Sequence, residues 1–155
     1  MTLMRTMLLA GALSLAAPAF AADAMSKDQY KAEKDRIEAE VKAAREKCKN
    51  MSGNAKDVCM AEAKGSQKVA KAELDARQKD TARARYNVTA AKADMEYDIA
   101  KEKCDDRTGK DKSACVKEAR AARDQAKKQA KVEREAAEGK KQRTADASRK
   151  MKETK

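Results

Sequence analysis

The sequence predicts an all-α protein built from two copies of one helical hairpin. After Pro18 the chain has no proline and only four glycines, and alanine, lysine, arginine, glutamate and aspartate dominate its composition. Most of these residues are good helix formers. A repeat with a fixed offset and apolar positions spaced alternately by four and three residues complete the prediction, since both are typical of packed helices.

The first element is an export signal at residues 1–21. Arg5 precedes the apolar run Met7–Ala17, Pro18 ends it, and small residues follow at Ala19 and Ala21. A run of 11 residues is too short to span a bilayer and is typical of a cleavable signal peptide. We expect the Sec route, cleavage after Ala21, and release of a mature chain without a transmembrane segment into the periplasm or the medium of a bacterium.

Two cysteine pairs define the repeat. Cys48 and Cys59 enclose ten residues, and Cys104 and Cys115 enclose ten more, 56 residues later. The offset is eight heptads, so the duplication preserves helical phase. One copy shows a continuous a/d stripe, which predicts a core seam with its tyrosines in packing roles: Tyr86, Ala90, Ala93, Tyr97, Ala100 and Cys104.

The expected domain organisation follows from the repeat. The ranges are a signal peptide at 1–21, hairpin repeat 1 at 22–80, hairpin repeat 2 at 81–138, and a basic, flexible C-terminal tail at 139–155. A break at residues 78–81, with Thr81 as an N-cap, gives four helices in an up-down-up-down bundle. One uninterrupted helix from about residue 57 to residue 103 gives an elongated coiled-coil-like rod instead.

The core is thin, which gives the cysteines a structural role. Only nine Ile, Leu and Val residues follow residue 21. An even number of cysteines in a small exported chain predicts disulfides. Of three pairings, Cys48–Cys59 with Cys104–Cys115 closes each hairpin at its loop, and each closure adds roughly 3 kcal/mol in the chain-entropy model. Ten-residue gaps without histidine disfavour zinc, so no metal is expected.

Positive charge gathers near the C-terminus. The chain has a formal net charge of +11, and residues 127–155 hold 11 basic and 5 acidic side chains. Such a segment favours contact with polyanions such as anionic lipid, lipopolysaccharide or nucleic acid. The candidate residues are Lys127, Lys128, Lys131, Arg134, Lys140, Lys141, Arg143, Arg149, Lys150 and Lys152.

Catalysis is not expected. The chain has no histidine, no glycine-rich phosphate loop and no Gly-x-Ser-x-Gly motif, and histidine is the commonest general base. We therefore expect no enzymatic activity, no catalytic residue and no cofactor.

The segment from Cys48 to Lys64, with Gly53-Asn54-Ala55-Lys56-Asp57-Val58-Cys59 at its centre, resembles an uncharacterised family of small exported beta-proteobacterial proteins. Its members carry this segment once or twice, and some are labelled TolA-like cell-envelope biogenesis proteins. The resemblance extends to about Ala130, and the second loop departs from the pattern at Lys110-Asp111-Lys112-Ser113-Ala114. It implies a place in the cell envelope.

These observations favour a non-catalytic structural or interaction protein of the cell envelope. Two alternatives are a polyanion-binding module that acts through the basic C-terminal region and a periplasmic holdase-like chaperone. The expected partners are envelope components or other polyanions, together with self-association through helices.

Overall fold

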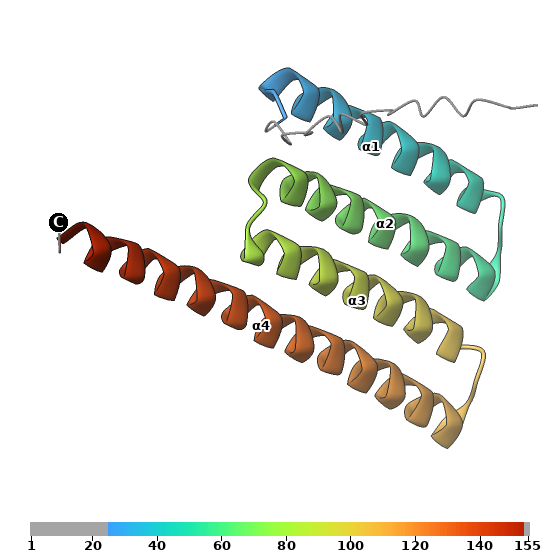
Figure 1. Cartoon of the computed structure of the whole chain (residues 1–155). Helices are drawn as coiled ribbons and strands as arrows, with labels where there is room; N and C mark the ends of the chain where they lie inside the picture. Colours follow the sequence, from blue (N-terminus) through green and yellow to red (C-terminus); the bar gives the residue numbers. More distant parts are fainter. Residues whose placement is uncertain (1–24, 154–155) are drawn as a thin grey trace, which may run out of the picture.

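The computed structural model describes residues 25–153, which form four helices (Figure 1). They are α1 (Lys27–Lys49), α2 (Gly53–Lys79), α3 (Ala82–Cys104) and α4 (Gly109–Glu153). This part of the chain contains no strand. The all-α prediction is confirmed, and the signal peptide lies outside the described residues.

The helices run alternately up and down and lie side by side in chain order (Figure 1). Within residues 25–153, α1 packs on α2, α2 on α3, and α3 on α4, and α1 has no packing contact with α4. The bundle is therefore an open row. The predicted up-down-up-down order is correct, and the single long helix of the rod alternative does not form.

Local chemistry explains the break between the hairpins. Asp80 ends α2 in the left-handed region at φ 36°, a conformation that aspartate tolerates better than most residues. The Thr81 side chain then accepts a hydrogen bond from the Ala84 backbone N–H at 3.0 Å and caps α3. This is the predicted N-cap, and it satisfies one of the free N–H groups at the start of a helix.

Residues that are 56 positions apart in the sequence occupy equivalent places in the two hairpins. Gly53 and Gly109 open the descending helices at φ 57° and 55°, where a side chain would be strained. Glu38 binds Lys71 at 3.1 Å, and Asp94 binds Lys127 at 2.6 Å in the equivalent place. The duplication in the sequence is thus a duplication of contacts.

The core differs in size between the copies. In the first hairpin Ile37, Val41 and Leu74 form a buried cluster. At the positions equivalent to Ile37 and Leu74, the second hairpin buries Ala93 and Ala130. The second hairpin therefore has alanine at two of the three positions that large aliphatic side chains occupy in the first.

The join between the hairpins depends on a small residue as well. Gly65 of α2 is buried, and a Cβ atom built on it would lie 2.8 Å from Met95 Cβ and 2.2 Å from Met95 Cγ. The methionine of α3 therefore fills the space that glycine leaves. This close contact between a methionine side chain and a glycine sets how near α2 and α3 can approach each other.

The C-terminal segment is part of α4. The helix continues through Gly139 to Glu153, and its last turns project beyond the start of α3 (Figure 1). Alanine, lysine and arginine favour this continuation from the packed part of the helix. The helix is therefore not interrupted at residue 139. The flexibility expected for residues 139–155 stays a prediction.

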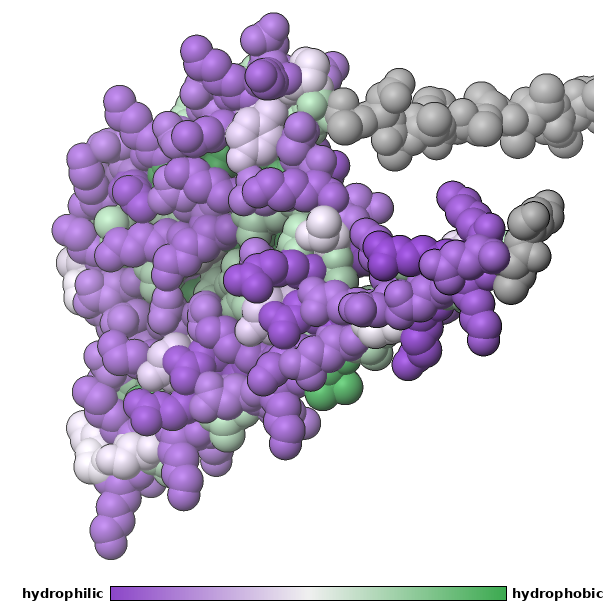
Figure 2. All heavy atoms as spheres, turned by 90° about the vertical axis from the view of Figure 1, so that its left-hand side faces the viewer, coloured by the Kyte–Doolittle hydropathy of each residue, from purple (hydrophilic) through white to green (hydrophobic). Residues whose placement is uncertain are grey.

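Hydrophilic side chains cover most of the molecular face in Figure 2, and hydrophobic patches lie in the gaps between them. None of the helices in residues 25–153 is long and apolar enough to cross a membrane.

Candidate interaction surfaces

The disulfides close both hairpins at the same end of the row. Cys48 pairs with Cys59 and Cys104 with Cys115, at Cα separations of 5.6 and 5.8 Å. This is the pairing predicted from the loop spacing. Cys48 and Cys104 are fully buried, and their partners are partly exposed. Each bridge thus ends the buried stripe of an ascending helix.

A shallow groove of about 580 Å³ follows the α1–α2 contact beside the first disulfide. Ile37, Val41 and Ala63 line its floor, and Glu40, Lys47 and Glu62 lie among its other lining residues. The second hairpin carries Tyr97 at the position of Val41, and the Arg123 guanidinium lies 4.4 Å from the centre of that ring. A larger, stacked side chain in one copy and a smaller one in the other distinguish the two hairpins.

The N-terminal half of α1 is tied to α2 by polar contacts. Tyr30 donates a hydrogen bond to the Asp75 carboxylate at 2.6 Å. This bond and partial burial raise the pKa of the Tyr30 hydroxyl above its ordinary value, because they favour the protonated form. Tyrosine at this position therefore joins two helices as well as packing in the core.

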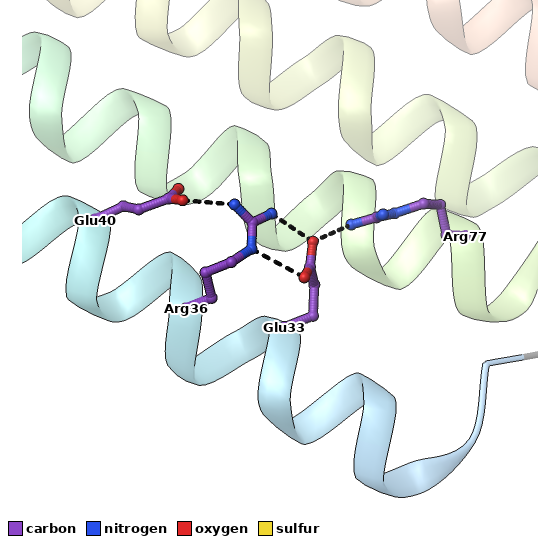
Figure 3. A network of polar contacts seen from close by, with 4 residues as sticks. All are labelled: Glu33, Arg36, Glu40 and Arg77. Carbon is purple, nitrogen blue, oxygen red and sulfur yellow. Dashed lines mark hydrogen bonds and ion pairs between the residues drawn. The ribbon is translucent and has the colours of Figure 1, made fainter.

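A carboxylate between two guanidinium groups lies beside this contact (Figure 3). Glu33 binds Arg36 at 2.6 Å and Arg77 of α2 at 3.1 Å, and Arg36 also reaches Glu40 at 2.5 Å. Hydrogen bonds from Arg36 and Arg77 lower the Glu33 pKa to about 2. Glu33 therefore keeps its charge, and its link to α2, through mildly acidic conditions.

The structure divides the predicted polyanion-binding residues into two groups. Within the row, Lys127 binds Asp94 at 2.6 Å, and the Arg134 guanidinium lies 5.2 Å from the centre of the Tyr86 ring. Lys131 has a longer contact to Glu135 at 3.9 Å. Lys127 and Arg134 therefore link α4 to α3, whereas the Lys131 contact lies within α4 and leaves that side chain exposed.

The second group lies on the projecting part of α4, residues 139–153, which we call the arm. Its exposed basic residues are Lys140, Lys141, Arg143, Arg149, Lys150 and Lys152. Asp146 and Glu153 are its acidic residues. Lys128, the remaining candidate, is exposed on the outer side of α4 within the row. The structure therefore brings six of the ten predicted residues together on one helical segment.

Sequence reasoning missed two surfaces, the outer faces of the end helices. On α1 the residues opposite the α2-facing stripe are Asp28, Ala32, Asp35, Ala39, Ala43 and Glu46, all exposed. On α4 the residues opposite the α3-facing stripe are Ala114, Lys117, Ala121, Gln125, Lys128 and Val132, also exposed. The 56-residue offset could have indicated both faces. It relates the outer face of α1 to the face of α3 that packs on α2, and the outer face of α4 to the face of α2 that packs on α3.

Among residues 25–153, no three cysteine, aspartate or glutamate side chains are grouped as metal ligands. Comparison of the chain with protein-family models, curated proteins and solved structures gives no match.

Proposed function

We propose that this chain is a non-catalytic, exported protein of the cell envelope that works by binding other molecules along its helices. The observation that carries the proposal is the pair of hairpins, each closed by a disulfide at the same end of an open row. Disulfides persist in oxidising compartments, and an open row exposes a large helical surface for its size. The alanine-rich leader at residues 1–21 supports the same location.

Export is tested by expressing the full chain with a C-terminal tag in a bacterial host. We expect recovery from the periplasmic fraction, an N-terminus at Ala22, and both disulfides in a non-reducing peptide map. The matched control is a chain with Leu8→Arg and Leu9→Arg in the apolar run, which should remain in the cytoplasm with its leader intact. A wild-type chain recovered from the cytoplasm with an uncleaved leader would contradict the proposal.

Polyanion binding is a second candidate, which one specific observation favours. The arm carries six exposed basic side chains and two acidic ones on a helix that projects past α3. Clustered lysines and arginines attract anionic surfaces through an interaction that salt screens. The candidate ligand is an anionic lipid surface or another polymer of negative charge.

The arm is tested in the full mature chain by replacing Lys140, Lys141, Arg143 and Arg149 with glutamine. We expect affinity for vesicles of phosphatidylglycerol and phosphatidylcholine to fall at least tenfold, since each basic residue near an anionic surface contributes roughly 1 kcal/mol. Glutamine keeps helix propensity, so circular dichroism should not change.

The control replaces four lysines of the row that lie outside the arm, Lys31, Lys34, Lys42 and Lys64, with glutamine, which gives the same loss of charge. This variant should lose less affinity than the arm variant. Equal losses in the two variants, or wild-type binding that does not weaken with salt, would exclude the arm as the binding surface.

A further inference from the structure

The join between the hairpins provides a template for contact between molecules. At the α2–α3 interface Met95 packs over Gly65, and Lys68 and Glu73 of α2 pair with Asp98 at 3.6 Å and with Lys92 at 2.7 Å. The two helices are antiparallel, so residues whose numbers sum to about 163 lie level with each other. This interface joins repeat 1 to repeat 2.

The duplication extends the template to the ends of the row. Because the offset is eight heptads, the outer face of α4 corresponds to the face that α2 turns toward α3. The outer face of α1 likewise corresponds to the face that α3 turns toward α2. The outer face of α4 could therefore meet the outer face of α1 of a second copy in the register of α2 and α3.

In that register the two faces are complementary. Lys128 lies level with Asp35 of a second copy, and Lys117 lies level with Glu46 of that copy. The equivalent pairs inside the molecule are Ala72 with Ala91 and Ala61 with Glu102. Charges of opposite sign thus appear on the two end faces at positions where the inner interface has an alanine pair or a single charge.

The side chains near the centre of the two faces are small. The positions equivalent to Gly65 and Met95 are Ala121 and, in the second copy, Ala39. Two small side chains therefore face each other where the inner interface has a glycine and a methionine. Val132, which is 58% exposed, lies level with Ala32 of that copy. One pair opposes the contact, because Glu135 lies level with Asp28. The balance of the interface is small apolar residues flanked by attractive charges.

We propose that the outer face of α4 binds the outer face of α1 of a second copy, in a head-to-tail array that continues the helix row. The contact is heterologous and does not close, so it adds copies one after another. The inner interface buries Val69 and partly buries Ile99, whereas the outer faces have Gln125 and Ala43 at these positions. The association is therefore weaker than the inner join, reversible and sensitive to salt.

Charge reversal in the full mature chain tests the proposal by sedimentation velocity at about 20 mM and 500 mM salt. Wild-type protein is expected to form concentration-dependent oligomers at low salt and to dissociate at high salt. Lys128→Asp and Asp35→Lys each place like charges at the junction, and each is expected to weaken association roughly tenfold. The double variant Lys128→Asp/Asp35→Lys restores the attraction and should return to within about threefold of wild type.

Mixing separates the surface contact from an effect on folding. In a one-to-one mixture of the two single variants every junction between unlike chains is attractive, so the mixture should associate more strongly than either variant alone. Lys31→Asp, which changes the charge of an exposed residue off the outer face by the same amount, should behave as wild type. A wild-type chain that is monomeric at low salt, or single variants that associate as wild type does, would overturn the proposal, as would a mixture no more associated than its components.

Discussion

Replacing Cys104 and Cys115 by alanine is expected to lower the free energy of unfolding by about 3 kcal/mol. The bridge between them closes a short loop, and Cys104 is fully buried at the end of the α3 stripe. The second hairpin buries only alanines and this cysteine, so it has few large apolar contacts with which to offset the loss. The loss is therefore a large share of the total stability of a domain this small.

Urea unfolding followed by circular dichroism measures the change. The unreduced wild type is the reference, and Ala114→Ser, a substitution at an exposed position of α4 next to Cys115, is the matched control that should stay within about 0.5 kcal/mol of it. Wild-type protein treated with reductant should lose at least as much stability as the double variant. Helicity and an unfolding midpoint that reduction leaves unchanged would contradict a stabilising role for the bridges.

Leu74→Ala is expected to destabilise the first hairpin by about 2–4 kcal/mol. Leu74 is 1% exposed and packs with Ile37 and Val41, and this trio is the main cluster of large apolar side chains among residues 25–153. Truncation leaves a cavity between α1 and α2, which already enclose the groove. The same urea measurement reports the loss.

The matched control for this variant is Val132→Ala, which removes apolar atoms from an exposed position of α4. That change should alter stability by no more than about 0.5 kcal/mol. If Leu74→Ala and Val132→Ala were equally mild, the α1–α2 cluster would not be the core of the first hairpin.

Local chemistry was accessible from the sequence. Thr81 follows Asp80 at a break in the helical pattern, which predicts an N-cap, and in the structure its side chain accepts a hydrogen bond from the Ala84 backbone N–H. The cysteine spacing gave both disulfide partners. The a/d stripe gave the inward face of α3, where Ala93 and Cys104 are buried. Each of these features depends on residues close together in the sequence.

The open row was not accessible in the same way. One a/d stripe per helix indicates one packing partner, whereas α2 and α3 each use two opposite faces. The second face depends on Gly65 and Ala84, both buried, and small residues of this kind are frequent everywhere in an alanine-rich chain. An open row and a closed bundle differ in tertiary contacts between small residues, and the sequence does not show which of its many small residues make them.

The roles of the tyrosines show the same limit. Packing accounts for their partial burial, but Tyr30 also donates to Asp75, and Tyr86 and Tyr97 each lie beside an arginine of α4. These partners are 26 to 48 residues away in the sequence, and only the register of the hairpins brings them together. Arg134, which the sequence places among the candidate polyanion-binding residues, lies over the Tyr86 ring, a contact that the sequence does not indicate.

The open row is tested most directly by the distance between α1 and α4. The distance between spin labels carried on unnatural amino acids at positions 31 and 131, which lie at similar heights on the two end helices, can be measured in 500 mM salt by electron paramagnetic resonance, with pulsed dipolar spectroscopy for long separations and continuous-wave line broadening for short ones. Three helix spacings of 8–10 Å predict a separation of roughly 25–30 Å. A distance near 10 Å would place α1 beside α4 in a closed bundle and would contradict the row, the exposed end faces and the self-association that depends on them.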